Sequence, residues 1–369
     1  MTTPDPAPRI PAELLRAQAG AILRAWGLDE ADAATTAEVL VDADLKGIES
    51  HGTSMLEVYA PMVRAGQIRL DAKPRILRES ASTALVDGMA AMGHPTGRFA
   101  MDLAIRKAEA ADVGVVAVRN ANHFGACGTY AERAVRRGLI AMVSCATRLA
   151  TVVPTGGATP MLGTNPFAFA APAGRHPPVV LDMATSVVPS NRIRVYGVQG
   201  KGIPAGWVVD GEGRDVTDAE LGYRLLRERV GGLTPLGGGS TLTGGHKGYG
   251  LGLFAQILGA TLAGASFTPL RLRTQGPADP DDIGLFFLAL NPAAFRPLEE
   301  FTADLDDVLD TLREAPRADP AQPVRIPGDP EWEERARREA TGLPMAPAVM
   351  SRLRAVARDS GCAWLLGAC

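Results

Sequence analysis

The sequence lacks several features that would each point to a different class of protein. It has only four cysteines in 369 residues and no Cys-X-X-Cys pair, so a disulfide framework or a cysteine-based zinc site is not expected. The formal net charge of -3 gives no electrostatic reason to expect nucleic acid or an acidic membrane as a partner. The cysteine pattern suits a reducing compartment, and we therefore expect a cytoplasmic protein.

Long apolar runs and targeting segments are also missing. The longest apolar stretch, residues 251–267, is interrupted by Gln256, Thr261 and glycines, and it is short for a membrane span. The first residues have no basic start and no apolar core, which argues against a signal peptide. The five histidines show no His-X-His or His-X-X-X-His spacing, so we expect no metal site.

Two kinds of hydrophobic periodicity divide the chain. Helical spacing dominates residues 1–75 and 300–369, whereas short apolar runs alternate with helical patterns over residues 76–299. This alternation predicts an α/β region between two helical ends. The expected helices cover 11–26, 29–47, 55–65, 98–111, 130–137 and 249–263, and the expected strands cover 83–86, 113–118, 139–145, 167–171, 179–182 and 285–290.

The chain contains no ordinary dinucleotide-binding fingerprint. Residues 250–255 formally match Gly-X-Gly-X-X-Ala, but no strand precedes them and no acidic residue follows about 20 positions later. If a nicotinamide cofactor binds, it does not use a Rossmann turn. The run GGHKGYG at 244–250 still offers backbone N–H groups and the charge of Lys247, which suits an anion. The alternative is a flexible loop with a solvated lysine.

Two histidines stand out as candidates for acid/base chemistry. His51 lies in Glu-Ser-His-Gly, and His123 lies in Asn-Ala-Asn-His-Phe-Gly shortly after a predicted strand. Small polar neighbours and glycine let a substrate approach each ring, and histidine titrates near neutral pH. The alternative for either is a solvated side chain, which we expect for His176, while His94 is expected in a turn before a helix.

Six motifs occur in one order along nearly the whole chain: ADLKGIESHG at 43–52, NANHFGACGTY at 120–130, LGTNPFAFAAP at 162–172, LDMATS at 181–186, GGHKGYGLGL at 244–253 and IPGD at 326–329. This set resembles the malate/L-lactate/ureidoglycolate dehydrogenase family, which includes L-sulfolactate dehydrogenases and Δ1-piperideine-2-carboxylate reductases. The resemblance implies an α/β, L-sulfolactate-dehydrogenase-like, non-Rossmann nicotinamide-binding sheet with helical N- and C-terminal segments packed together. It also implies a homodimer or a higher assembly of dimers.

The resemblance assigns roles to individual residues. It implies that His123 is the proton acceptor, with His51 and Ser50 near the reacting carbon, and that Asn165 and Met55 lie at the small-molecule substrate. The expected cofactor-binding residues are Thr147, Asp182, Met183, Ala184, Arg192, His246, Lys247, Pro327, Gly328 and Asp329. The cofactor is NAD or NADP, and Arg192 together with Arg194 would favour the 2′-phosphate of NADP.

Departures from the family pattern keep three hypotheses open. Met55 replaces an arginine suited to a substrate carboxylate, while 190–192 and Leu285 also differ from the usual motifs. Arg148, Arg192 or Arg194 would be substitute cations. The first hypothesis is an oxidoreductase that interconverts 2-hydroxy and 2-oxo acids, and the second is a reductase of a cyclic imine. The third is a non-catalytic, ligand-binding member of the family.

Overall fold

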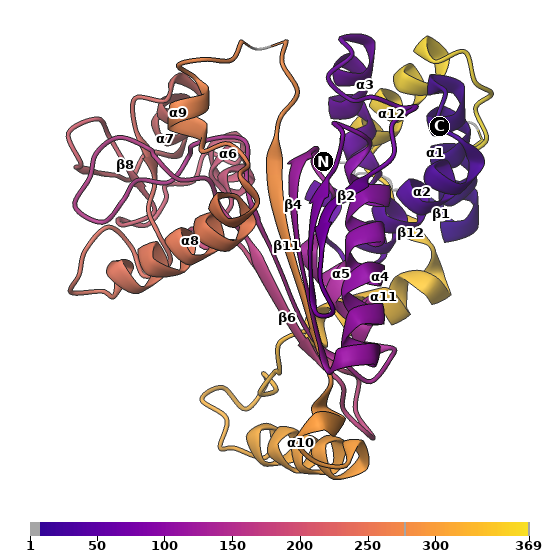
Figure 1. Cartoon of the computed structure of the whole chain (residues 1–369). Helices are drawn as coiled ribbons and strands as arrows, with labels where there is room; N and C mark the ends of the chain where they lie inside the picture. The colour runs from indigo at the N-terminus through magenta and orange to yellow at the C-terminus, as the bar shows by residue number, and fades with distance from the viewer. Residues whose placement is uncertain (1–7, 277, 368–369) are drawn as a thin grey trace.

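The computed structural model describes residues 8–276 and 278–367, and its centre is a seven-stranded sheet. Figure 1 shows helices α1, α2, α3 and α12 on one side of the sheet and a smaller lobe with α6 to α9 on the other. The strand order is β2-β3-β4-β11-β5-β6-β7. The strands are β2 (Arg75–Glu79), β3 (Thr83–Asp87), β4 (Val113–Ala121), β5 (Ile140–Ala146), β6 (Phe167–Ala171), β7 (Val179–Met183) and β11 (Ile283–Leu290).

The strands of the sheet do not lie in the order in which they follow one another along the chain. Strand β11 lies between β4 and β5 and runs antiparallel to both, although about 140 residues separate it from β5. Among the described strands of this sheet, β3 and β4 are the only neighbours that run parallel. The α/β class is confirmed, but the sheet is mixed, because a strand from far along the chain enters its middle. Its apolar run is almost entirely buried, as expected for a strand covered on both faces.

Helices α4 (Gly93–Ala111) and α5 (Cys127–Val135) cover one face of this sheet and form the largest core with it. Close packing of α4 depends on a glycine in β4, because a Cβ atom on Gly114 would lie 1.9 Å from the carbonyl oxygen of Ala104. Helix α4 begins five residues earlier than expected, so Gly93 and His94 belong to its first turn rather than to a preceding turn.

The two ends of the chain share a second core. It joins α1 (Ala12–Trp26), α2 (Glu30–Leu45), α3 (Leu56–Arg64) and α12 (Pro347–Asp359). The short strands β1 (Arg9–Ile10) and β12 (Leu343–Pro344) pair antiparallel, so the helical N- and C-terminal segments do pack together. Asp29 caps α2 by accepting a hydrogen bond from the backbone N–H of Asp32 at 2.9 Å. The division into domains at 1–75, 76–299 and 300–369 stays a prediction.

A small lobe that the sequence analysis did not predict occupies the region between β7 and α8. It contains α6 (Ser190–Val198), α7 (Ala219–Glu228), the two-residue strands β8 (Val208–Val209), β9 (Asp215–Val216) and β10 (Gly232–Leu233), and its own apolar cluster. Helix α8 (Gly245–Gly259) follows, so most of the GGHKGYG run forms its first turns, and the helix ends before Ala263. Among the described residues, no helix is long and apolar enough to span a membrane.

Candidate active site

The three predicted catalytic residues lie together at one edge of the sheet. His51 belongs to the short helix η1 (Glu49–His51), and His123 follows the end of β4 by two residues. The two imidazole rings are stacked with centroids 5.4 Å apart, and Ser50 Oγ lies 2.9 Å from Nδ1 of His51. We call Ser50, His51, Tyr59, His94 and His123 the histidine cluster. It unites residues from four separate segments of the chain.

A buried carboxylate holds the turn that carries His51. One oxygen of Asp44 accepts hydrogen bonds from the backbone N–H of Thr53 at 2.9 Å and from its hydroxyl at 2.7 Å. The turn also needs a glycine at 52, because a Cβ atom there would lie 1.7 Å from the other oxygen of Asp44. Burial raises the pKa of Asp44 from its usual 3.8 to about 6, against the two hydrogen bonds from Thr53, which lower it.

Sequence analysis missed two members of the cluster. Tyr59 on α3 is buried, and its hydroxyl oxygen lies 2.5 Å from Nδ1 of His123. His94 was expected in a turn, but it is fully buried in the first turn of α4. Its ring lies edge-on to Tyr59 with centroids 5.6 Å apart. No local pattern in the sequence distinguishes Tyr59 from an ordinary buried tyrosine of an amphipathic helix.

Burial sets the protonation state of the cluster. It lowers the pKa of His123 well below the usual range, and the neighbouring His51 and His94 lower it further. Burial also lowers the pKa of His51, and it lowers that of His94 to about 3. Near neutral pH, therefore, all three imidazoles are uncharged. A neutral imidazole has one nitrogen lone pair that accepts a proton, which is the form that a general base requires.

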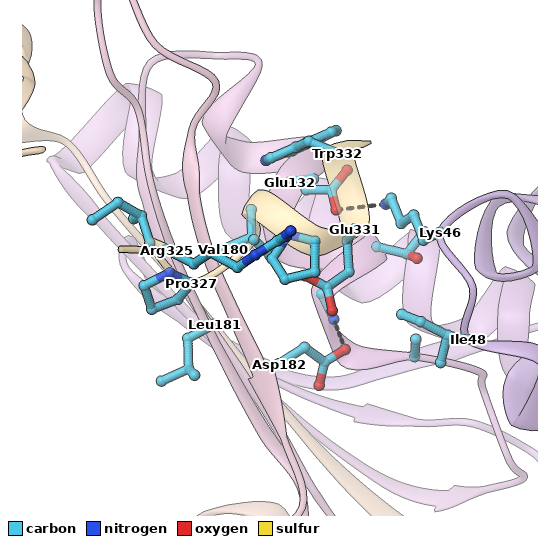
Figure 2. Close-up of a pocket in the computed structure, with 16 residues that line it drawn as sticks. Lys46, Ile48, Glu132, Val180, Leu181, Asp182, Arg325, Pro327, Glu331 and Trp332 are labelled. Atoms are coloured by element: carbon cyan, nitrogen blue, oxygen red, sulfur yellow. Dashed lines mark hydrogen bonds and ion pairs between the residues drawn. The ribbon is translucent and has the colours of Figure 1, made fainter. Parts of the chain in front are cut away.

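A cavity of about 360 Å³ lies at the side of β7, close to the start of α5. Figure 2 shows Asp182 at this cavity, with Pro327 above it and Lys46 across from it. We call it the Asp182 pocket. Its lining residues are Lys46, Ile48, Ala126, Gly128, Thr129, Glu132, Val180, Leu181, Asp182, Arg325, Ile326, Pro327, Gly328, Pro330, Glu331 and Trp332. Three of the expected cofactor-binding residues, from segments far apart in sequence, therefore share one cavity.

Asp182 has one oxygen engaged and faces the pocket. Its Oδ2 accepts a hydrogen bond from the backbone N–H of Gly128, at the start of α5, at 2.6 Å. The protein surrounding the pocket disfavours the ionised carboxyl and raises the pKa of Asp182 to about 6, although the Gly128 hydrogen bond lowers it. Above that pH, the carboxylate has free lone pairs for hydroxyl donors. It suits the ribose of a dinucleotide.

The lysine of the pocket is already neutralised. Lys46 is buried, and its Nζ lies 2.5 Å from Glu132 and 2.6 Å from Asp42, while the Trp332 ring lies 5.6 Å away. Lys46 therefore joins α2 to α5 beside the pocket and does not offer a free cation.

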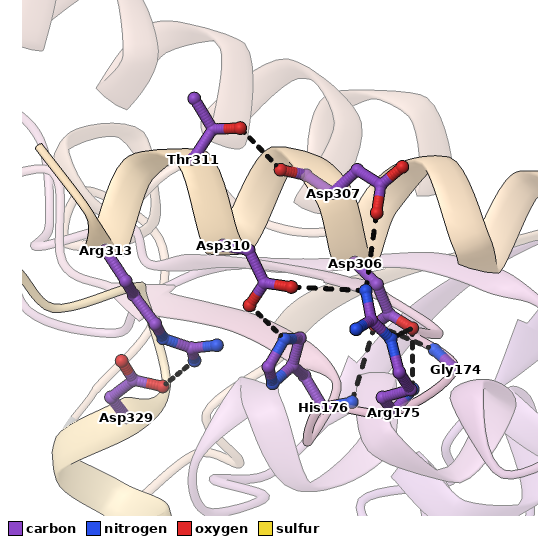
Figure 3. A network of polar contacts seen from close by, with 9 residues as sticks. All are labelled: Gly174, Arg175, His176, Asp306, Asp307, Asp310, Thr311, Arg313 and Asp329. Atoms are coloured by element: carbon purple, nitrogen blue, oxygen red, sulfur yellow. Dashed lines mark hydrogen bonds and ion pairs between the residues drawn. The ribbon is translucent and has the colours of Figure 1, made fainter.

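The loop that supplies Pro327 and Gly328 is held in place by the first residue of helix α11 (Asp329–Thr341). The helix begins at Asp329, which accepts a hydrogen bond from the N–H of Ile326 at 2.9 Å and pairs with Arg313 at 2.9 Å. Arg313 ends helix α10 (Leu298–Arg313), drawn with its partners in Figure 3. Asp329 is thus an anchor of the loop and is not itself part of the pocket lining.

Helix α10 is fixed in turn to the loop after β6. Asp306 accepts hydrogen bonds from the backbone N–H groups of Gly174 at 3.1 Å and Arg175 at 2.7 Å (Figure 3). His176, which was expected to be solvated, lies with Nε2 2.7 Å from Asp310. These contacts brace α10 against the sheet, and through Arg313 they also support the 326–329 loop.

Asn165 connects the end of β5 to helix α8. Its side-chain oxygen accepts the backbone N–H of Thr147 at 3.0 Å, and its amide nitrogen donates to the carbonyl of Gly252 at 3.1 Å. The side chain is completely buried, so both ends of the amide are used within the protein. Asn165 therefore shapes this region by holding Thr147 in place.

The remaining predicted residues lie outside the histidine cluster and the Asp182 pocket. Met183 and Ala184 continue the chain directly after Asp182, and Met55 is half-buried against the helical core. His246 and Lys247 are exposed in the first turn of α8, where Lys247 has no ion-pair partner within the described residues. Arg192 is exposed on α6 and does not line the Asp182 pocket. The described part of the chain contains no group of ligands arranged for a metal.

Comparison with known proteins matches this arrangement to one family. The family model for malate/L-lactate dehydrogenase matches residues 10–354. The chain is 37% identical over 353 residues to a malate dehydrogenase of Pyrococcus abyssi, covering 96% of this chain and 95% of the relative. It is 32% identical over 260 residues to a Δ1-pyrroline-2-carboxylate/Δ1-piperideine-2-carboxylate reductase of Pseudomonas putida, covering 70% of this chain and 72% of that protein.

A solved structure confirms the expected fold. The sulfolactate dehydrogenase of Methanocaldococcus jannaschii superposes with a TM-score of 0.86 at 33% identity, over 96% of this chain and 98% of that one. The protein is therefore an oxidoreductase of the nicotinamide-dependent kind, with a sheet unlike the Rossmann fold. The chain belongs to the malate/L-lactate dehydrogenase family, whose members act on hydroxy acids or imines.

Proposed function

We propose that the protein interconverts a 2-hydroxy acid and a 2-oxo acid by hydride transfer to or from NAD or NADP, with His123 as the acid/base. The observation that carries this proposal is the histidine cluster beside the Asp182 pocket. His123 and Gly128, which contacts Asp182, are only five residues apart on one connected segment. A proton acceptor and a pocket suited to a ribose therefore lie within the length of one dinucleotide.

The chain's own residues supply position and a proton. A bound nicotinamide would supply the hydride chemistry, which no side chain provides. His123, neutral near pH 7, takes the proton of the substrate hydroxyl in oxidation and returns it to the carbonyl in reduction. His51, oriented by Ser50 and stacked on His123, forms a wall of the same site. A positioned acid/base of this kind accelerates a reaction by about 100- to 10,000-fold.

The expected cofactor-binding residues suggest where the ribose and the pyrophosphate of the dinucleotide bind. Asp182 accepts from ribose hydroxyls in the pocket lined by Pro327 and Gly328. Lys247 and the N–H groups at the start of α8 bind the anionic pyrophosphate, because a helix N-terminus with an unpaired lysine favours negative charge. We expect Met183, Ala184 and Thr147 to contact the cofactor between its ribose and its pyrophosphate. The exposed Arg192 stays a hypothesis for the 2′-phosphate of NADP.

Met55 supports a second candidate function, reduction of a cyclic imine such as Δ1-piperideine-2-carboxylate. It places an uncharged, flexible side chain where the family usually has an arginine and so changes the shape of the pocket, while the carboxylate that both candidate substrates carry needs another partner. The P. putida relative carries an imine reductase's name. The same proton donor would serve both reactions, because protonation of nitrogen in place of oxygen needs only the imidazolium.

One experiment separates these functions. Purified protein is titrated with NADH and NADPH by nicotinamide fluorescence and then assayed with oxaloacetate, pyruvate, 3-sulfopyruvate and Δ1-piperideine-2-carboxylate. We expect saturable binding of at least one cofactor and turnover of a 2-oxo acid. Turnover of the imine alone would replace the first function by the second. Cofactor binding without turnover of any of these compounds would favour a non-catalytic ligand-binding protein.

We also propose that the protein acts in the cytoplasm as a homodimer or an assembly of dimers. Free thiols at Cys127, Cys145 and Cys362 support a reducing compartment. An apolar strip on α8, with Leu253 at 41%, Phe254 at 39% and Ile257 at 48% exposure, supports burial against a second copy. Light scattering of the wild type and of Ile257→Glu would test this, because a charge at the centre of the interface should yield the monomer.

A further inference from the structure

The ring of His123 has one hydrogen-bond partner among the described residues, and that partner is a buried tyrosine. Tyr59 Oη lies 2.5 Å from Nδ1, and the tyrosine is 1% exposed. No carboxylate or carbonyl group is hydrogen-bonded to either ring nitrogen in the described part of the chain. The contact therefore decides which of the two nitrogens carries the proton when His123 is neutral.

We propose that Tyr59 is a positioning residue that accepts a hydrogen bond from Nδ1–H of His123 and thereby fixes Nε2 as the nitrogen that exchanges the proton with substrate. This inference rests on the proposed function of His123. In the opposite arrangement Tyr59 would donate to Nδ1, and the proton of the neutral ring would then sit on Nε2. A ring in that form cannot accept a proton at Nε2.

The proposed arrangement serves both directions of the reaction. After Nε2 takes a proton from the substrate hydroxyl, the imidazolium still donates from Nδ1 to the same tyrosine oxygen. When Nε2 gives the proton back, the neutral ring keeps its proton on Nδ1, so Tyr59 never has to change its role. A hydrogen bond to a charged group is worth about 10- to 100-fold in an equilibrium constant. The imidazolium needs that support, because burial of His123 disfavours the charged form of its ring.

In this arrangement His94 is the acceptor for the hydroxyl proton of Tyr59. Its ring lies edge-on to Tyr59, and both of its nitrogens are buried without a hydrogen-bond partner within the described residues. A buried nitrogen without a partner is costly, so a donor beside it is expected. A small rotation of the two side chains would let the hydroxyl donate to His94 while its oxygen accepts from His123. The order of the chain is then His123, Tyr59, His94.

Nitrogen-15 NMR of the histidine side chains in the wild-type protein tests this directly, without any substrate. The His123 signals are assigned by their loss in His123→Asn. We expect a neutral ring protonated on Nδ1 at pH 7.5. A ring protonated on Nε2 would overturn the proposal, because Tyr59 would then be the donor. This result does not depend on whether the protein turns over any compound, so it is separate from a failure of the proposed function.

Deletion of the tyrosine hydroxyl gives the kinetic test. Tyr59→Phe should lower kcat by about 10- to 100-fold, with NADH or NADPH binding unchanged, and the NMR should show the proton shifting toward Nε2. Tyr130→Phe is the matched control, because that tyrosine is also buried and its hydroxyl donates to the carbonyl of Phe124 instead. It should change kcat by less than about threefold.

Each result then has a defined meaning. Full kcat in Tyr59→Phe would contradict the proposal, as would an equal loss in the two variants, which would indicate general loosening of the core. If Tyr59→Phe fails to fold by circular dichroism, the NMR tautomer of the wild type alone decides. A shift of the proton to Nε2 together with the selective loss of kcat would support the chain from His123 through Tyr59.

Discussion

Replacement of Asp44 by asparagine should reveal the free-energy cost of burying a carboxylate beneath the His51 turn. Both hydrogen bonds from Thr53 reach the same oxygen, Oδ2, so the amide oxygen of Asp44→Asn accepts both of them in the same place. What the variant removes is the buried charge. The pKa of Asp44 rises from its usual 3.8 to about 6 on folding, a difference of about 2.2 units, chiefly because of burial.

The sign and size of the effect follow from that pKa. The pKa of Asp44 is higher in the folded protein than in the unfolded chain. Below pH 3.8 the carboxyl is protonated in both states and does not destabilise the fold. As the pH rises through 6, its ionisation in the unfolded chain lowers the free energy of unfolding. At about 1.4 kcal/mol per unit, the penalty approaches about 3 kcal/mol above pH 7, and roughly half of it is present at pH 5. The free energy of unfolding of Asp44→Asn relative to wild type should therefore increase by about 1.4 kcal/mol between pH 5 and pH 8.

Urea unfolding of the two proteins at pH 5, 6, 7 and 8 measures this difference. Every other titrating group is common to both proteins, so the change with pH isolates residue 44, and any constant offset from the new amide N–H₂ group cancels. A difference that stays constant within about 0.5 kcal/mol over this range would refute the reasoning. It would mean that Asp44 titrates at an ordinary pKa in the folded protein.

Three further substitutions test the cofactor-binding region. Asp182→Asn should remove the pH dependence of NADH affinity near pH 6, where the wild-type carboxyl, with a pKa of about 6, loses acceptors on protonation; isothermal titration at pH 5.5 and 7.5 checks this. Lys247→Ala should weaken NADH binding by about tenfold, and the loss should shrink in high salt. Fluorescence titration of both proteins at two ionic strengths measures this, and equal NADH affinities of variant and wild type would contradict the prediction. Arg313→Ala frees Asp329 and should raise the cofactor Kd about three- to tenfold without altering substrate preference, and equal Kd values would show that α10 does not support the loop.

Much of the fold followed from periodicity. Strand β6 was predicted with its observed bounds, and the other predicted strands were correct to within a few residues, because short apolar runs bounded by turns are a strong signal. The place of β11 between β4 and β5 could not be predicted, because pairing between segments so far apart leaves no local trace. The strands of the small lobe were missed, because strands of two residues carry too little pattern.

The site was predictable only in part, for a related reason. His51 and His123 stood out because small polar residues and glycine surround them. Tyr59 and His94 did not, because a tyrosine in an amphipathic helix and a histidine near a proline look like ordinary packing until the fold brings them against His123. Glu132 and Lys46 likewise become a pair only when α2 lies against α5.

The most direct test of the central claim compares wild type with His123→Asn in a single assay. The rate of hydride transfer is followed by NADH absorbance with the best substrate of the panel, and the cofactor Kd is measured on the same samples. We expect the rate to fall by at least about 100-fold while the Kd changes by less than about threefold, because His123 handles only the proton. A variant that keeps its rate would contradict the account and would move the acid/base role to His51.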